Sequence, residues 1–305
     1  MVGVWLVIAI ILIFALPRKK LIVPLLLTFF NVPLGQVVVL GGLHFTVLRI
    51  MILAGLLRRA TFHAPSAEEG KYPGGFNGVD QMVVLWAICS EVILSLQWTE
   101  TQALIHNAGD LIDALGGYLL IRFLIPDREA IVQTVKAFAW VCVIQGAFMT
   151  SEQFIGQNLF GYLGGTSIWV TVRDGEIRSQ GVLGCIYAGV FGGTLIPLFL
   201  WLRGEGKYRG IAIAGIAGAL AMVITSRSST SWMALAGSLT GLAFWALRKQ
   251  MRLIRWGFAL TLVGLHLVMN GPVWSLIAKV DLTGSSSSYH RFYLVNNCII
   301  HFSDW

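Results

Sequence analysis

The feature of the sequence that most constrains its fold is a series of apolar runs, each of roughly the length that a helix needs to cross a bilayer. A spanning helix takes about 20 residues. The sequence therefore predicts an all-α, polytopic helical membrane protein, with one transmembrane domain over 1–305. About ten transmembrane helices are expected, near residues 2–17, 21–35, 40–57, 80–97, 110–125, 131–149, 182–202, 208–225, 230–247 and 253–270.

Composition excludes a water-soluble fold. Hydrophobic residues make up 56% of the chain and charged residues 12%, whereas a soluble domain carries about 25% charged residues. The formal net charge of +7 arises from short basic clusters between apolar runs, which is typical of topology signals and argues against nucleic-acid binding. The four cysteines form no CxxC pair, so neither a disulfide framework nor a zinc site is predicted.

The basic clusters predict an orientation, because loops on the cytoplasmic side of a membrane are enriched in Lys and Arg. If the loop at 18–20 is cytoplasmic, the alternate loops at 58–71, 128, 203–209 and 248–255 carry the other basic clusters. The N-terminus is then extracytoplasmic. Three polar segments face the same side: a loop at 150–181, the turn at 225–231 and the tail at 271–305.

Five cations lie on this cation-poor face and break the rule, namely Arg173, Arg178, Arg227, Lys279 and Arg291. Arg178 and Arg227 each stand at a membrane boundary among Ser and Gly residues. A guanidinium binds phosphate oxygens in a bidentate fork and keeps its charge in a partly dry site. The pair therefore favours a phosphate or diphosphate ligand. The alternative is that each arginine only extends to lipid headgroups.

His290 follows a run of serines in the tail and precedes Arg291. Its pKa near neutrality suits a general base, so His290 is the candidate catalytic residue. The alternative is an exposed loop histidine without a role. The outward loops contain no DxD motif or His/Asp cluster, which favours a mechanism without a metal or other cofactor.

Charged residues within the apolar runs predict structural ion pairs, because buried ions in membranes usually pair or line a cavity. We expect Glu91 to pair with Arg49 or with Arg122. Asp110 and Asp113 fall where a helix is expected to start, so we expect them to cap that helix.

Four stretches in order resemble the O-antigen ligase and O-antigen polymerase family of bacterial envelope proteins. They are Glu152-Gln153-Phe154-Ile155-Gly156-Gln157-Asn158; Gly175 to Gly181 leading into Leu195-Ile196-Pro197-Leu198; Thr225-Ser226-Arg227-Ser228-Ser229; and Ser285 to Arg291 followed by His301 to Trp305. The resemblance covers the second half of the chain.

The resemblance implies an inverting, metal-independent glycosyltransferase with a GT-C-like fold in the bacterial inner membrane. Its donor would be a polyprenyl-diphosphate-linked glycan, and its acceptor a lipid A–core sugar or another lipid-linked unit. Arg178, Arg227 and Arg291 would hold the donor diphosphate, and His290 would accept the proton of the attacking hydroxyl. Members of this family continue beyond such a C-terminus, so the chain is expected to be truncated within its large outward loop.

Two other function classes remain open. A transporter or flippase would also have many spans and buried charges, and it predicts Arg49, Glu91 and Arg122 around a central cavity. A structural membrane protein predicts that the polar groups do not converge at all.

Overall fold

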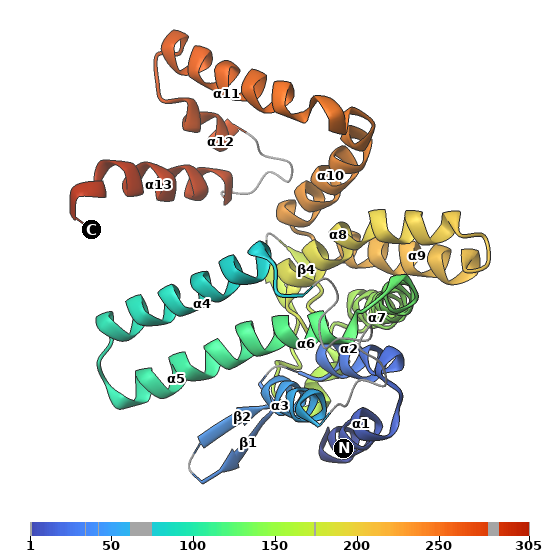
Figure 1. Ribbon diagram of the computed structural model, residues 1–305. Coiled ribbons are helices and arrows are strands. Elements are labelled where there is room, and N and C mark those ends of the chain that lie inside the picture. The colour runs from blue at the N-terminus through green and yellow to red at the C-terminus, as the bar shows by residue number, and fades with distance from the viewer. Residues whose placement is uncertain are drawn as a thin grey trace.

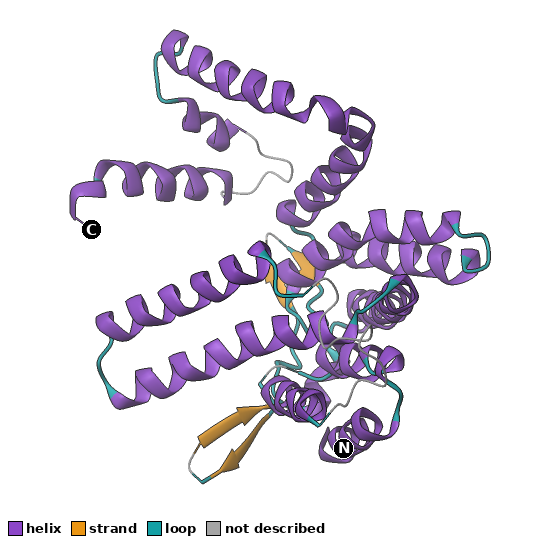
Figure 2. Cartoon of the chain, viewed as in Figure 1, coloured by secondary structure: helices purple, strands orange, loops and turns teal. Residues whose placement is uncertain are grey.

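The computed structural model describes residues 2–33, 35–41, 43–61, 75–173, 175–279 and 287–304. Most of this part of the chain is helical, in agreement with the predicted class, and two small antiparallel hairpins are added (Figures 1 and 2). The helices are α1 (Val2–Ala15), α2 (Ile22–Asn31), α3 (Val47–Ala60), α4 (Gly78–Gln97), α5 (Thr101–Leu111), α6 (Gly117–Leu124), α7 (Arg128–Ile155), α8 (Cys185–Gly204), α9 (Arg209–Thr225), α10 (Ser229–Phe244), α11 (Met251–Val268), α12 (Leu276–Lys279) and α13 (Ser287–Ile300).

Among the described residues, four helical stretches are long and apolar enough to cross a membrane, which indicates a membrane protein by length and composition. They are Gly78–Gln97, Arg128–Ile155, Cys185–Gly204 and Ser229–Val268. The last comprises α10, a 3-10 segment (Trp245–Gln250) and α11, and it bends between the two helices (Figure 1). The helices α1 and α9 are apolar but shorter. The expected number of about ten spans is therefore not confirmed.

The expected span at 40–57 is not one helix. Strands β1 (Val37–Leu40) and β2 (Leu43–Thr46) pair in an antiparallel hairpin, and α3 begins only at Val47. The residues of the hairpin are mainly β-branched or aromatic, and such residues favour strands. A short apolar run of this kind cannot be assigned to helix or strand from its hydrophobicity alone.

The helices α7, α8 and α9 form the best-packed part of the molecule. Buried side chains from all three meet there, among them Cys142, Phe199 and Met222. A Cβ added at Gly146 would lie 2.6 Å from the carbonyl oxygen of Gly218, so glycine at this point lets α7 and α9 approach closely. A second apolar cluster joins α1, α2, α3 and α6, with Ile22 and Phe123 at its centre.

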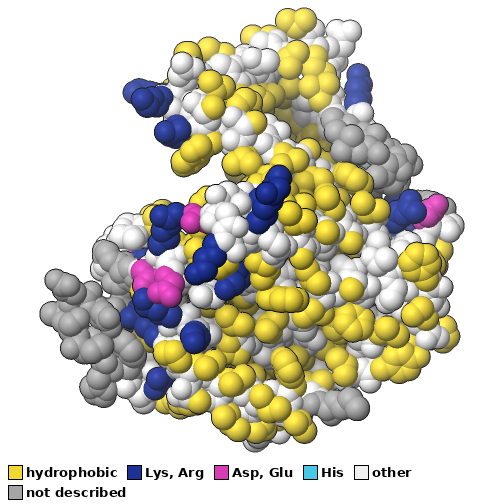
Figure 3. Space-filling model, turned by 90° about the vertical axis from the view of Figure 1, so that its right-hand side faces the viewer, with side chains coloured by type: hydrophobic (Ala, Val, Ile, Leu, Met, Phe, Trp, Pro, Cys, Tyr) yellow, Lys and Arg dark blue, Asp and Glu magenta, His cyan; other side chains and the backbone are white. Residues whose placement is uncertain are grey.

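Three of the predicted cytoplasmic loops meet at one end of these helices. Lys19 Nζ lies 2.9 Å from a carboxylate oxygen of Asp127 and 3.0 Å from one of Glu129. Arg128 pairs with Glu205 in the loop after α8. Figure 3 shows Lys and Arg side chains gathered with acidic ones within a largely hydrophobic surface. Because α7 and α9 start at this end, the 150–181 loop and the 225–231 turn lie at the other.

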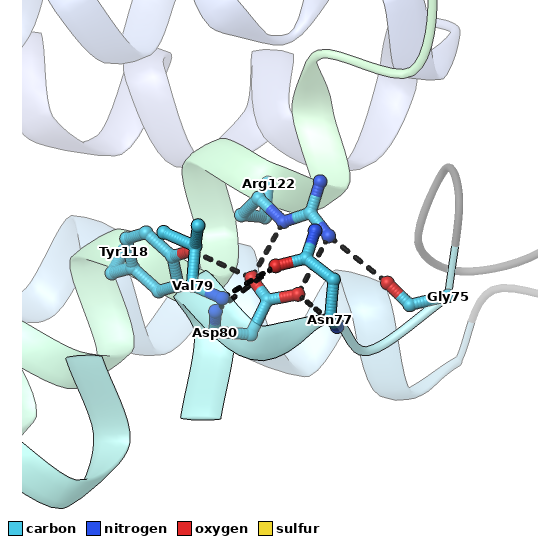
Figure 4. A network of polar contacts seen from close by, with 6 residues as sticks. All are labelled: Gly75, Asn77, Val79, Asp80, Tyr118 and Arg122. Atoms are coloured by element: carbon cyan, nitrogen blue, oxygen red, sulfur yellow. Dashed lines mark hydrogen bonds and ion pairs between the residues drawn. The ribbon is translucent and has the colours of Figure 1, made fainter. Parts of the chain in front are cut away.

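The predicted pairing of Glu91 is wrong. Arg122 instead forms a bidentate ion pair with Asp80, with Nε 2.9 Å from Oδ1 and Nη2 2.8 Å from Oδ2. Tyr118 donates to the same carboxylate at 2.6 Å, and Asp80 accepts the backbone N–H of Asn77, which closes a capping box at the start of α4 (Figure 4). The sequence could not indicate this pair, because 42 positions separate its partners.

Arg49 also pairs with an aspartate and not with Glu91. Its Nη2 lies 2.8 Å from Oδ2 of Asp113, and its Nε 3.2 Å from Oδ1. Asp110 lies 3.7 Å from the same guanidinium. Both aspartates stand inside the helical stretch formed by α5, a π-helical segment (Ile112–Gly116) and α6, and not at its start. The expectation that they cap a helix is therefore wrong.

Candidate functional site

The residues after β4 are held by a buried carboxylate of α7. The hairpin of β3 (Thr171–Arg173) and β4 (Glu176–Arg178) belongs to the predicted outward loop. Glu152 is fully buried, and its two oxygens accept the backbone N–H groups of Gln180 at 2.7 Å and of Gly181 at 2.8 Å. A buried carboxylate needs such donors. This contact fixes the segment that carries Arg178.

Two glutamines of α7 complete this attachment. Gln145 accepts the backbone N–H of Val182 at 3.2 Å and donates to the carbonyl oxygen of Phe30 at 2.7 Å, which ties the segment to α2. Gln153 donates to Ser179 Oγ at 2.7 Å. Gly181 has φ +55°, and a Cβ there would lie 2.5 Å from Gln145 Oε1, so this position requires glycine.

Arg178 lies against the C-terminal end of α9. The backbone N–H of Ser179 donates to the carbonyl oxygen of Thr225 at 3.0 Å, and Arg178 Nε is 3.4 Å from the carbonyl oxygen of Ser226. A guanidinium has five N–H donors, and this long contact occupies one of them. The Arg178 side chain is half-buried at the end of the helical core.

Arg227 occupies the turn between α9 and α10 in a left-handed conformation, with φ +47°. Such a backbone costs an L-residue other than glycine about 1–2 kcal/mol. Arg227 Nη2 lies 3.3 Å from Oε2 of Glu176, two residues before Arg178. Arg178 in turn contacts the carbonyl directly before Arg227. The structure therefore brings these two predicted residues together through reciprocal contacts.

The serines around Arg227 have a structural role that the sequence did not indicate. Ser226 and Ser231 are fully buried, and their hydroxyls lie 3.0 Å apart. A Cβ at Gly189 of α8 would come within 2.5 Å of Ser226 Oγ and 2.0 Å of Ser231 Oγ, so this glycine makes room for the pair. These hydroxyls therefore anchor the turn that presents Arg227 and do not project beside its guanidinium.

Arg291 also reaches this turn. Its Nη2 is 2.7 Å from Oγ1 of Thr230 in the first turn of α10, three residues after Arg227, and its Nη1 is 3.5 Å from Met233 Sδ. His290 precedes Arg291 on α13 and is exposed. The tail expected to be a loop over 271–305 thus contains α12 and α13, and its contact through Arg291 places the start of α13 beside α10.

The electrostatics of this region favour an anion. Arg178 and Arg291 contact the segment 226–230, to which Arg227 belongs, and Glu176 is the described acid that faces Arg227. The ion pair is at the surface, since the side chain of Arg227 is 52% exposed and that of Glu176 59%. An exposed pair of this kind is weak, so a phosphate can displace the carboxylate.

Sequence reasoning did not assign roles to Glu152, Gln145 or Glu176. A signal was present for the first two. They are separated by seven positions on α7 and therefore share one face of the helix. Two strongly polar residues on one face of an apolar helix indicate a buried polar contact. Nothing in the sequence marks Glu176 as the partner of Arg227.

No protein-family model, no curated protein and no solved structure matches this chain. The geometry around the 226–230 turn is therefore the basis on which a function is inferred.

Proposed function

We propose that the protein is a membrane glycosyltransferase of bacterial surface polysaccharide assembly. It transfers a glycan from a polyprenyl-diphosphate donor to a sugar hydroxyl, as O-antigen ligases and polymerases do. The supporting observation is the reciprocal contact of Arg178 and Arg227, two cations from distant parts of the chain, at one end of the helical core. The active face is the extracytoplasmic face of the inner membrane, opposite the basic loops.

The chemistry requires a site for a leaving diphosphate. The acceptor hydroxyl oxygen attacks the anomeric carbon of the donor sugar, and the bond from that carbon to the diphosphate oxygen breaks. Negative charge then grows on the diphosphate. Fixed guanidinium groups stabilise this charge more than the ground state, which lowers the barrier. Arg178 and Arg227 take this role, and Glu176 yields its place beside Arg227 to the phosphate.

The hydroxyl must lose its proton as it attacks. His290 accepts it, because its side chain is exposed and its neighbour Arg291 is held at the same turn. General base catalysis of this kind contributes about 10²–10⁴-fold in rate. The acceptor is a lipid A–core sugar for a ligase, or a second lipid-linked unit for a polymerase.

The test is complementation of surface-glycan assembly by Arg178→Ala, Arg227→Ala and His290→Ala, with membrane levels measured in parallel. Loss of an arginine from an electrostatic site is expected to lower the rate by about 10²-fold or more. Arg173→Ala, on the same hairpin and exposed, serves as the matched control and should retain activity.

Binding of a polyprenyl diphosphate to the purified protein separates the roles. Arg178→Ala and Arg227→Ala should weaken binding, whereas His290→Ala should leave binding unchanged and abolish transfer. Unchanged glycan assembly in all three variants, at normal membrane levels, would refute the proposal.

A transporter is the second candidate, favoured by the two arginine–aspartate pairs among apolar helices. In each pair the guanidinium makes two contacts with one carboxylate, so its charge is already compensated. Glu91 does not join either pair, which differs from the arrangement expected for a common cavity. Flux of a lipid-linked substrate into proteoliposomes that is lost in Arg49→Ala but retained in Arg178→Ala would favour this candidate.

A further inference from the structure

An apolar groove follows α1 and α2 and lies outside the candidate site. It consists of two adjoining cavities of about 330 Å³ and about 390 Å³, which share Trp5 and Leu27. The smaller cavity runs along α1 from Trp5 past Leu12 and Leu16 to Lys20. The larger continues toward Asn31 and Leu163 at the other end of the molecule.

The smaller cavity is polar only at its Lys20 end. The indole N–H of Trp5 donates to Thr28 Oγ1 at 3.2 Å, and this buried hydroxyl donates to the carbonyl oxygen of Pro24 at 2.8 Å, so neither leaves an unpaired polar group in the groove. Gln133, one helical turn after Glu129 on α7, belongs to the same lining. A lining of this kind suits an apolar chain with one charged end.

Lys20 is the charged residue in the lining of the smaller cavity. Lys19 is occupied by Asp127 and Glu129, whereas Lys20 is exposed and has no ion pair within the described ranges. A second ammonium, that of Lys136, lies 3.4 Å from Gln133 Oε1. The mouth therefore complements an anionic headgroup.

The length of the cavity fits one leaflet. Leu16 directly follows α1 and lies eleven positions after Trp5, which corresponds to about 16 Å at 1.5 Å per residue. Half of a hydrocarbon core is about 15 Å. An acyl chain that enters the groove at Leu16, with its headgroup at Lys20, therefore ends near Trp5.

We propose that this groove binds one anionic phospholipid of the leaflet at the basic end of the molecule. One acyl chain lies along α1 against Leu12 and Trp5, and the phosphate contacts Lys20, with Gln133 as a hydrogen-bond donor. Anionic lipid is the natural occupant, because it supplies both the chain and the charge and is abundant where basic loops lie.

The experiment uses the full chain in vesicles that contain phosphatidylglycerol or phosphatidylcholine with brominated acyl chains. Bromine quenches tryptophan at short range, and the difference between the unsubstituted protein and Trp5→Phe isolates the signal of Trp5. Phosphatidylglycerol should be preferred about fivefold, the factor expected from one lysine–headgroup contact. Lys20→Gln should abolish the preference, and Lys249→Gln, a change in another basic loop, should preserve it.

Three results would overturn the proposal. Equal quenching by the two lipids would show contact with bulk lipid only. An unchanged preference in Lys20→Gln would place the selectivity elsewhere. Displacement of the brominated phosphatidylglycerol by an equimolar amount of polyprenyl phosphate would assign the groove to a prenyl chain. Circular dichroism of each variant verifies that the helices are retained.

Discussion

The core formed by α7, α8 and α9 differs from the arm formed by α10 and α11, although both are apolar. In the most apolar 18-residue windows, 50% of the residues of α7 and 44% of those of α8 are buried, against 0% for the arm. Figure 1 shows α11 extending away from the core, whereas α10 begins beside α8, where a Cβ added at Gly193 would lie 3.0 Å from the backbone nitrogen of Leu235. Hydropathy therefore identifies a lipid environment, and it does not distinguish a helix that packs from one that faces lipid.

Small residues that face a neighbouring helix distinguish the packed positions from the lipid-facing ones. In the core, Gly146 and Gly218 allow backbones to touch, with an added Cβ at Gly218 only 2.4 Å from the carbonyl oxygen of Cys142. In the arm, Gly241 and Gly257 have no described atom within 4 Å of an added Cβ. Close helix packing in membranes depends on small residues that face a neighbour.

The largest loss of stability is expected when the buried carboxylate of Glu152 in the core is removed. Glu152→Ala leaves two buried backbone N–H groups without an acceptor, at about 1–3 kcal/mol each, so a loss of about 2–6 kcal/mol is expected. Thermal unfolding in detergent measures it. Glu91→Ala, on α4 with only 11% of the span buried, is the matched control and should change stability little. Equal losses in the two variants would contradict this view of the core.

A smaller effect is expected when glycine is replaced by alanine, with opposite signs of the stability change in the core and in the arm. Gly218→Ala forces α7 and α9 apart and is expected to destabilise by about 1–3 kcal/mol, as overpacking does. Gly241→Ala meets open space and should stabilise its helix by about 0.5–1 kcal/mol. The two melting temperatures should therefore move in opposite directions. A shift of the same sign in both would show that the arm is as tightly packed as the core.

The smallest effect is the pH dependence of stability that Asp127 produces at the start of α7. The backbone N–H of Ala130 and the ammonium of Lys19 hold the pKa of Asp127 below its usual value. Because the folded-state pKa is lowered, the stabilisation is present above about pH 4, the unfolded value, and is lost as the pH falls through the folded value.

Asp127→Asn keeps a capping oxygen and removes the charge. Its melting temperature should therefore fall less than that of the unsubstituted protein between pH 6 and pH 3, by roughly the small amount that an exposed pair provides. The arm contains no Asp or Glu between Ser229 and Val268, so it cannot contribute to this difference. Identical acid profiles would indicate that the contact with Lys19 is not formed in solution.

The sequence predicted the long helices well, because α4, α7 and α8 are continuous apolar segments with recognisable ends. Asn77 and Asp127, for example, cap α4 and α7. It also marked Arg178, Arg227 and Arg291 as exceptions to the predicted orientation, and the structure places Arg178 and Arg227 in reciprocal contact. It failed where the outcome depends on the tertiary partner. Arg49 and Arg122 could have paired with any nearby carboxylate, and only folding selects Asp113 and Asp80.

The left-handed backbone at Arg227 has a consequence for the entropy of binding. A long side chain on a flexible turn loses rotational freedom when it binds a ligand, at about 0.5–1.5 kcal/mol for each side chain immobilised. Here folding fixes the backbone at φ +47°, and buried Ser226 and Ser231 lock the turn. Folding therefore orders the backbone of this turn in advance, and the anion that we propose to bind here has only the side chain of Arg227 left to order.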